Sequence, residues 1–472
     1  MNFLILINSA PQYKYFYFEV GAALERAGHK IYYAVDSKRS CILEPLAELD
    51  GSASAFFFDE FFKKHYEANL ASMYNDVTWG ECFFSEFDRF LTHDFNLDKP
   101  EEYWQKAKSC LESFFEDLIK DLDITAVVYE NISNSFAFFA YKAAQNNNKK
   151  YLGLIASRLS GRFEIQTSIL DGEVERIQRL AALEPTDDEL KWYDAYRNNI
   201  MNISPDYMLY NNLDNISMMK LFSLKKVIHV VRLLKSYWRV DHFYDYQFGN
   251  PIRAITKGLQ VNLTRKISAI RSLKYFDADR TIELSSQREI FYVYPIHFHP
   301  ESSTSVLSPL YTNEFNNILN ISNCLPFGVK LYVKDHMSAY GCQPAEFYRK
   351  VSALPGVRLV KPSHNIKKLI IKSQGLITVN STAGFEALIL GRPVYLLGRV
   401  FYQDFPGVVK LNNFSEIPSG LEMLDVDAKM VAAHIVAYYR YTYEGDLRIG
   451  SWKTKERKYY ERLACLLEER AC

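Results

Sequence analysis

One stretch of the sequence constrains the fold of this chain more than any other. Residues 375–402 read GLITVNSTAGFEALILGRPVYLLGRVFY. The pattern predicts a short buried strand at 376–379, a turn of small polar residues, a helix at 383–390 that stops at Gly391, and a second strand at 394–397. Strand, turn, helix and strand in this order form half of a doubly wound nucleotide-binding domain.

The turn in this stretch has the composition of an anion-binding site. Asn380 opens it, and Ser381 or Thr382 can cap the helix that follows, whose free N–H groups then point out from the carboxyl end of a parallel strand. Gly384 would let a phosphate or a sugar approach the backbone closely, and Glu386 could reach ribose hydroxyls. The same pattern also fits a capped helix in any α/β protein, so it does not decide the function alone.

Length and composition set the broad class. A chain of 472 residues is too long for one ordinary core and predicts two domains of about 200 residues each. The 56 acidic and 56 basic residues balance, so overall charge indicates no partner. The seven cysteines are scattered without a CxxC pair, which argues against a disulfide framework or a zinc site and for a reducing compartment. No apolar run reaches the roughly 18 residues of a membrane span, and we expect a cytoplasmic protein.

The first 171 residues predict an α/β domain. Residues 2–35 alternate strand, helix and strand, which predicts a parallel sheet, and no GxGxxG motif follows the first strand. Residues 51–120 read as helical. Later strands place Glu130 at a carboxyl end, as the candidate base or nucleophile, and Arg158 and Arg162 just past the next strand, as anion or acceptor ligands. Asp36 is the second, less favoured acid. Each of these charges could equally be structural.

The middle of the chain, residues 172–288, predicts helices and is locally basic. Residues 220–274 carry twelve Lys or Arg against two Asp, a local charge of +10 in a neutral protein. This amphipathic region could lie on an anionic membrane, hold an anionic acceptor, or simply cover a sheet edge as a solvated helical hairpin. No nucleic-acid-binding motif accompanies the charge. The basic residues are Lys220, Lys225, Lys226, Arg232, Lys235, Arg239, Arg253, Lys257, Arg265, Lys266, Arg271 and Lys274.

A second α/β unit begins at 289, and three polar loops follow its predicted strands. They are HFHPESST at 297–304, the group Lys334, Asp335 and His336, and the turn at 380–382. Because carboxyl ends of parallel strands meet at one edge, these loops are expected to share a crevice in which Lys334 and His336 neutralise a nucleotide phosphate. A metal site at His297 and His299 is disfavoured because no third ligand is specified.

In this order, YPIHFHPESSTSV, LYVKDH, VRLVKPSHN and GLITVNSTAGFEALILGRPVYLLGRVFYQDFPGV resemble the bacterial capsule polysaccharide biosynthesis/export proteins, the Kps-type Kdo transferase group, over residues 291–408. The resemblance implies a GT-B architecture, two Rossmann-like domains facing across a cleft, without an obligatory metal. It also implies sugar transfer from a nucleotide donor, often CMP-Kdo, into a capsule or lipopolysaccharide chain. Met337 stands where the family often has proline. The matching positions are His297, His299, Glu301, Lys334, His336, Ser381, Thr382, Gly384, Glu386 and Tyr402.

The sequence therefore predicts a GT-B-like α/β glycosyltransferase with a first domain at 1–171, a helical basic insertion at 172–288, a nucleotide-sugar domain at 289–424 and C-terminal helices at 425–472 that return to the first domain. The expected donor is CMP-Kdo or a UDP-sugar, the acceptor a glycan or glycolipid, and no cofactor is obligatory. Peripheral association with the cytoplasmic face of the inner membrane through 220–274 is expected. Two alternatives are a non-catalytic adaptor of capsule assembly and a nucleotide-sugar epimerase.

The site predicted from the sequence has three parts. Its catalytic candidates are Glu130, His299 and Glu301; its donor-binding candidates are Lys334, His336, Asn380, Ser381, Thr382, Gly384, Glu386 and Tyr402; and its anion- or acceptor-binding candidates are Arg158 and Arg162.

Overall fold

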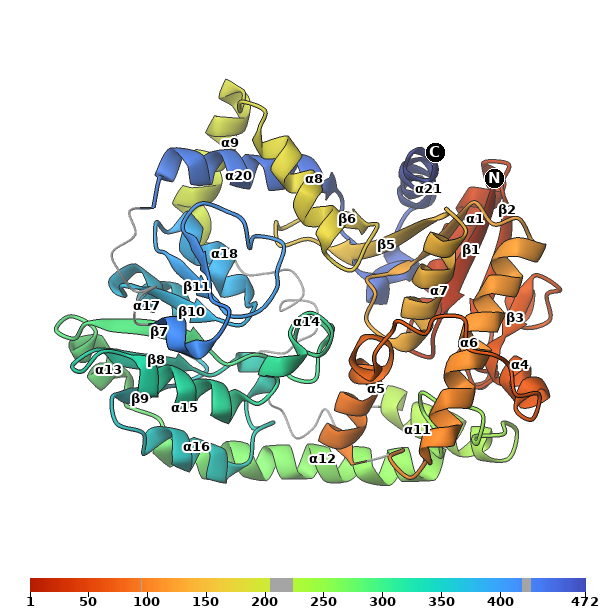
Figure 1. Ribbon diagram of the computed structural model, residues 1–472, viewed down its shortest axis with the longest axis horizontal. Helices are drawn as coiled ribbons and strands as arrows, with labels where there is room; N and C mark the ends of the chain where they lie inside the picture. Colours follow the sequence, from red (N-terminus) through yellow and green to blue (C-terminus); the bar gives the residue numbers. More distant parts are fainter. Residues whose placement is uncertain (95, 204–223, 418–425) are drawn as a thin grey trace.

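The computed structural model describes residues 1–94, 96–203, 224–417 and 426–472. Within these residues the chain forms two α/β domains that lie side by side (Figure 1). Lys220 of the basic region lies outside the described residues, as do the side chains of Lys225 and Lys226.

The first domain is built on a sheet with the strand order β13-β6-β5-β4-β1-β2-β3. Strands β1 to β5 are parallel to one another, β6 pairs with β5 in the antiparallel direction, and β13 pairs with β6 in the antiparallel direction. The strands are β1 (Asn2–Ile7), β2 (Lys30–Val35), β3 (Ala55–Phe57), β4 (Ala126–Glu130), β5 (Lys150–Ala156), β6 (Arg162–Gln166) and β13 (Tyr443–Glu444).

The second domain has a fully parallel sheet in the order β12-β11-β10-β7-β8-β9. Its strands are β7 (Phe291–Pro295), β8 (Lys330–Lys334), β9 (Val357–Val360), β10 (Gly375–Thr378), β11 (Val394–Leu396) and β12 (Val408–Lys410).

Both sheets reverse their strand order once, between β1 and β4 in the first and between β7 and β10 in the second. Such a topological switch point opens a crevice at the carboxyl ends of the strands. The predicted fold class, α/β with two Rossmann-like domains in a GT-B-like arrangement, is confirmed. Four short strands, β3, β6, β12 and β13, were not predicted. β3 lies inside the 51–120 region that the sequence predicts as helical, because three residues are too few to show a strand period.

Helices cover both sheets, and the first core is strongly aromatic, with Phe58, Phe83, Phe114 and Tyr103 buried against one another. The first-domain helices are α1 (Tyr13–Arg26), α2 (Ser40–Leu43), α3 (Ala47–Asp50), α4 (Phe58–His65), α5 (Trp79–His93), α6 (Glu101–Asp121) and α7 (Ser135–Asn146). Those of the second are α14 (Ser302–Ser305), α15 (Glu314–Cys324), α16 (Ala345–Ser352), α17 (Ile366–Lys372) and α18 (Thr382–Ile389).

Five further helices connect the domains: α8 (Asp171–Ala181), α9 (Asp187–Asn199), α11 (Leu224–Tyr237), α12 (Pro251–Ser272) and α13 (Asp279–Ser285). The long helix α12 spans from one domain to the other along one side of the molecule (Figure 1). Its last turns are fixed to the second domain, where Ser268 Oγ donates to Gln343 O at 2.5 Å and Arg265 Nε donates to Tyr340 O at 3.1 Å. Near its start, Arg253 pairs with Asp98 of the first domain at 3.1 Å.

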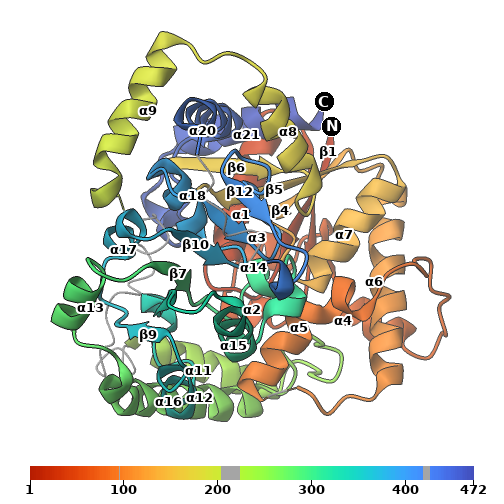
Figure 2. The same cartoon turned by 60° about the vertical axis from the view of Figure 1, so that its left-hand side comes forward.

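The C-terminal part of the chain crosses between the domains. Helix α20 (Ala428–Tyr441) packs against α8 and α18 (Figure 2), β13 then joins the first sheet, and α21 (Arg457–Ala471) packs on α1. Short 3-10 turns complete the described structure: η1 (Ile200–Asn202), η3 (Leu273–Tyr275), η4 (Pro309–Tyr311), η5 (Met337–Ala339), η6 (Phe414–Glu416) and η7 (Ile449–Thr454). Among the helices of the described residues, none combines the length and the apolar character needed to cross a membrane.

Candidate functional site

The turn after β10 has the geometry that its sequence predicts. Ser381 is the N-cap of α18, and its Oγ accepts a hydrogen bond from the Ala383 N–H at 3.2 Å. Thr382 is the first residue of the helix. The turn follows β10 directly and therefore lies at the switch point next to β7.

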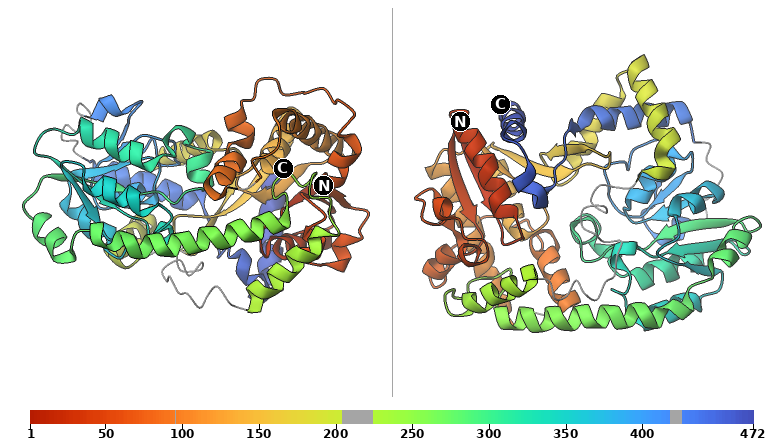
Figure 3. Two further views of the ribbon diagram at one scale, coloured as in Figure 1. Left: turned by 90° about the horizontal axis from the view of Figure 1, so that it is seen from below. Right: turned by 180° about the vertical axis from the view of Figure 1, so that it is seen from behind.

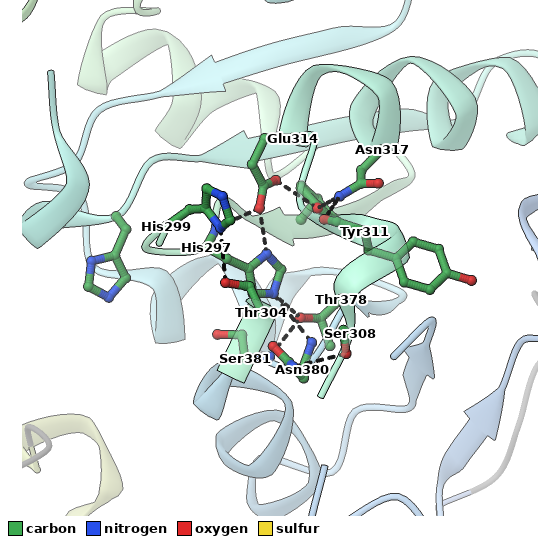
Figure 4. A network of polar contacts seen from close by, with 12 residues as sticks. His297, His299, Thr304, Ser308, Tyr311, Glu314, Asn317, Thr378, Asn380 and Ser381 are labelled. Carbon is green, nitrogen blue, oxygen red and sulfur yellow. Dashed lines mark hydrogen bonds and ion pairs between the residues drawn. The ribbon is translucent and has the colours of Figure 1, made fainter. Parts of the chain in front are cut away.

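His297 and Glu314 support this turn through a chain of polar contacts (Figure 4). His297 Nδ1 lies 2.9 Å from Glu314 Oε1, and Nε2 lies 3.1 Å from Thr378 Oγ1. Thr378 Oγ1 also accepts the Ser381 N–H at 3.1 Å. Through Glu314 and Thr378, His297 connects the start of α15 to the turn that precedes α18.

His299 makes the contact that reaches furthest across the domains. Its Nε2 lies 2.7 Å from Oδ1 of Asp88, a buried residue of α5 in the first domain, and its Nδ1 lies 3.0 Å from Thr304 Oγ1. Ser305 Oγ donates to the second oxygen of Asp88. Both nitrogens of the ring are therefore hydrogen-bonded, and the loop after β7 is held to the first domain.

Glu130 lies at the end of β4, as predicted. Its carboxylate accepts hydrogen bonds from Tyr13 Oη at 2.7 Å and Ser133 Oγ at 3.1 Å. Burial raises the pKa of Glu130, and these hydroxyls counteract part of that rise. The next residue, Asn131, donates from Nδ2 to Ser302 Oγ of the second domain at 3.1 Å. The switch points of the two sheets thus meet.

A pocket lies between the domains at this point. The first domain lines it with Asn131, Arg158 and Glu164 among others, and the second with Asn380 and Phe401. Asn380 Nδ2 donates to Ser308 Oγ at 3.1 Å, whereas its buried Oδ1 has no hydrogen-bond partner among the described residues. The pocket has a volume of about 90 Å³, well below the roughly 300–1,000 Å³ of small-molecule sites.

Lys334 ends β8, His336 lies two residues further along the chain, and the two side chains differ in charge at pH 7. Lys334 Nζ donates to Pro362 O at 2.9 Å, and burial lowers the pKa of Lys334 to about 8. His336 Nδ1 accepts the Ser338 N–H at 3.1 Å, and burial together with nearby Lys334 lowers the pKa of His336 to about 4. At pH 7 the lysine carries a charge while the imidazole is neutral and offers an N–H.

Other predicted donor-side residues are engaged with the protein itself. Glu386 pairs with Lys367 at 3.1 Å, and burial raises the pKa of Glu386. The space above Gly384 holds the phenol of the fully buried Tyr402, whose Oη donates to Ser381 O. Glycine is needed at 384 because a larger side chain would collide with this ring. The ring fills the place where a phosphate or sugar was expected from the sequence.

The remaining candidates divide between the cleft and the domain junctions. Glu301 is exposed, accepts a hydrogen bond from Ser303 Oγ at 3.2 Å and lies within electrostatic range of Arg158. Arg162 is directed away from the pocket: its guanidinium donates to Thr442 Oγ1 at 2.7 Å near β13.

Asp36, the second acid considered, is buried after β2. It accepts the Ser9 N–H at 2.9 Å, and it lies close to the buried pair of Arg39 and Asp245. Asp245 belongs to the segment between α11 and α12, so this carboxylate cluster attaches the connecting helices to the first domain and does not face the pocket.

Sequence reasoning missed Glu314, Thr378 and Asp88. Thr378 lies within the strand predicted at 376–379 and is the last residue of β10, so its position beside the turn was accessible from the sequence. Glu314 and Asp88 are single acids on helices, and nothing in their local sequence distinguishes them from surface carboxylates.

Residues 216–441 match the family model described as "Capsule polysaccharide biosynthesis protein". Over these residues the chain is similar to the capsule polysaccharide biosynthesis family. The match covers slightly less than half of the 472 residues and includes every predicted site residue of the second domain. The resemblance drawn from the sequence motifs is confirmed. Comparison with curated proteins gave no match.

Solved structures of similar shape come from two groups of proteins. Thermosulfurimonas dismutans KpsC, a beta Kdo 2,4 transferase, is 14% identical over 66% of this chain and 79% of its own, with a TM-score of 0.36. UDP-GlcNAc 2-epimerase from Neisseria meningitidis bound to UDP-GlcNAc is 13% identical over 93% of this chain and 99% of its own, with a TM-score of 0.28. Similarities this distant carry no argument about the reaction of this protein.

Proposed function

We propose that this protein is a glycosyltransferase that moves a sugar from a nucleotide donor to a capsule or lipopolysaccharide acceptor, with CMP-Kdo as the first donor to test and UDP-sugars as the second. The observation that carries the proposal is the meeting of two switch points: Glu130 ends β4, and the next residue, Asn131, donates a hydrogen bond to Ser302, which follows β7. The similarity of residues 216–441 to a capsule synthesis family supports the same class of reaction.

In this proposal the second domain binds the donor. The N–H groups at the start of α18, the charged Lys334 and the N–H of neutral His336 stabilise the nucleotide phosphate as it leaves. The unpaired Oδ1 of Asn380 offers a buried acceptor to a donor hydroxyl. Since the pocket holds about 90 Å³, the domains separate to admit a nucleotide sugar. The reaction needs no obligatory metal or cofactor.

The first domain supplies the reactive carboxylate. Glu130 is hydrogen-bonded by two hydroxyls, and burial raises its pKa, in the direction that favours proton uptake by a general base. His299 acts as a positioning residue, because both of its ring nitrogens are occupied by Asp88 and Thr304. Arg158 contributes positive charge at the pocket for an anionic sugar or acceptor.

The test is an assay of nucleotide release with CMP-Kdo, UDP-sugars and GDP-sugars. We expect one donor to be turned over, and Glu130→Gln to reduce that turnover by about 100-fold or more without lowering the melting temperature. Glu175→Gln, at an exposed position of α8, is the matched control and should retain full activity. EDTA should leave turnover unchanged.

Two results would oppose the proposal. Indifference to every donor, in both turnover and thermal stabilisation, would remove the enzymatic interpretation. Capsule production that persists with Glu130→Gln and His336→Ala would instead support the non-catalytic adaptor.

A further inference from the structure

Helix α12 carries an apolar stripe on the side that faces away from the protein. Ile252, Leu259, Leu263 and Ile270 recur at spacings of seven, four and seven residues, which places them on one face of an α-helix. Their side chains are between 41% and 72% exposed. On the opposite face, Ala269 is buried against the second domain. The helix thus turns its apolar face to solvent.

Helix α11 repeats this arrangement beside it. Val227, Val231 and Leu234 in α11, and Trp238 directly after it, follow the same helical spacing and are between 38% and 76% exposed. Leu233 on the other face is buried. The two helices pack together, and both are in open view from below (Figure 3, left). The two adjacent helices thus expose eight apolar side chains between them, and exposed apolar side chains that gather in this way mark interaction surfaces.

Cations surround the two stripes. Residues 227–274 contain nine Lys or Arg and two Asp, a net charge of +7. Some of these cations serve the fold: Arg232 donates to Leu43 O at 2.7 Å, and Arg253 pairs with Asp98. Four others are exposed beside the stripes, namely Lys235, Arg239, Arg271 and Lys274.

We propose that α11 and α12 bind the surface of an anionic lipid bilayer. The apolar stripes enter the boundary of the acyl chains, Trp238 sits at the headgroup level, and the exposed cations contact anionic headgroups. Two straight neighbouring helices with apolar faces and flanking cations match such a planar, negatively charged surface. A second copy of the chain fits less well, because two faces that each carry four exposed cations would repel each other. The cytoplasmic leaflet supplies the required lipid charge.

Vesicle sedimentation tests the proposal without any donor or acceptor, so its result is independent of the proposed reaction. The full chain should bind vesicles that contain phosphatidylglycerol, more weakly as salt rises, and bind pure phosphatidylcholine poorly. Trp238 emission should shift to the blue on binding, and Trp238→Phe should remove most of the shift. Leu259→Glu with Leu263→Glu should weaken binding by about tenfold or more.

Two variants serve as comparisons. Arg271→Gln with Lys274→Gln should weaken binding to anionic vesicles by about 30-fold, given the contribution of each cation near a charged surface. Leu183→Glu with Leu190→Glu changes two leucines that are 56% and 38% exposed near α9 and should have no effect. Circular dichroism confirms that each variant is folded.

Three outcomes would overturn the proposal: wild type that ignores anionic vesicles, equal binding by wild type and the Leu259 and Leu263 variant, or a concentration-dependent dimer that this variant abolishes. The last result would assign the face to a second copy of the chain.

Discussion

Asp88 in the first domain and His299 in the second are joined directly, with 2.7 Å between Oδ1 of the aspartate and Nε2 of the histidine. Asp88 also accepts a hydrogen bond from Ser305, so one buried carboxylate holds two residues of the loop after β7. The contact crosses the domain boundary at the edge where both switch points meet. It therefore holds the two domains together next to the candidate site.

Asp88→Asn should loosen this contact between the domains. A hydrogen bond to a charged group contributes about 1.5–3 kcal/mol, so we expect kcat/KM to fall by roughly 10- to 100-fold. If His299 positions the cleft, the change should appear mainly in KM, and small-angle scattering should record a larger radius of gyration.

Asp94→Asn is the control for this prediction, because Asp94 pairs with Lys257 at the exposed end of the same helix. It should leave both measurements unchanged. A kcat that falls alone, with an unaltered scattering profile, would indicate that His299 takes part in the chemistry itself.

Glu314 should prove a major contributor to the stability of the second domain. It accepts hydrogen bonds from Tyr294 Oη at 2.8 Å and from the backbone and ring of His297 at 3.1 Å and 2.9 Å. Glu314→Ala leaves three buried donors without an acceptor, and we expect a loss of roughly 3 kcal/mol or more in the free energy of urea unfolding. Glu314→Gln keeps one carbonyl acceptor and should cost clearly less. Equal losses would mean that packing, and not these hydrogen bonds, fixes His297.

The sequence specified the strands, the helices and the polar loops better than it specified the partners within the site. The period of the apolar residues and the cap at Ser381 are local signals, and the structure reproduces both. The pairing of His299 with Asp88 depends on how α12 and α20 set one domain against the other, which no local pattern encodes. The contact between Gly384 and Tyr402 is a second example, because Tyr402 lies beyond the next strand and the sequence around Gly384 does not reveal it.

Acid should destabilise the protein through His336. The pKa of this imidazole is about 4 in the folded chain and about 6.5 when unfolded. Between these values the unfolded chain binds a proton that the folded chain does not, so the stability contributed by neutral His336 is complete above pH 6.5 and is lost as the pH falls toward 4. The full effect is roughly 3 kcal/mol at most.

His336→Asn isolates this contribution, because the amide oxygen can replace Nδ1 as acceptor for the Ser338 N–H. Urea unfolding at several pH values should give a smaller acid-induced loss in the variant than in wild type. The comparison between the two proteins matters, since buried Asp335, with a pKa raised to about 6, works in the opposite direction. If stability depended on pH in the same way in both proteins, folding would not lower the pKa of His336.

Gly384→Ala discriminates between helix propensity and packing at the candidate donor turn. Propensity alone favours alanine by about 1 kcal/mol in a helix. The new Cβ would clash with Oη of the buried Tyr402, however, and overpacking costs about 1–3 kcal/mol. We expect net destabilisation in urea unfolding, whereas Gly258→Ala in α12, where no neighbouring atom lies within 4 Å, should stabilise.

Tyr402→Phe completes a double-mutant cycle with Gly384→Ala. The single variant removes the atom nearest to the new methyl group and also the hydrogen bond to Ser381 O. If the clash is the cause, the two substitutions together should cost less than the sum of the single costs, with a coupling of about 0.5–3 kcal/mol. Strict additivity would mean that the turn absorbs the extra methyl group by shifting α18, and donor binding at Ser381 should then change in the single glycine variant.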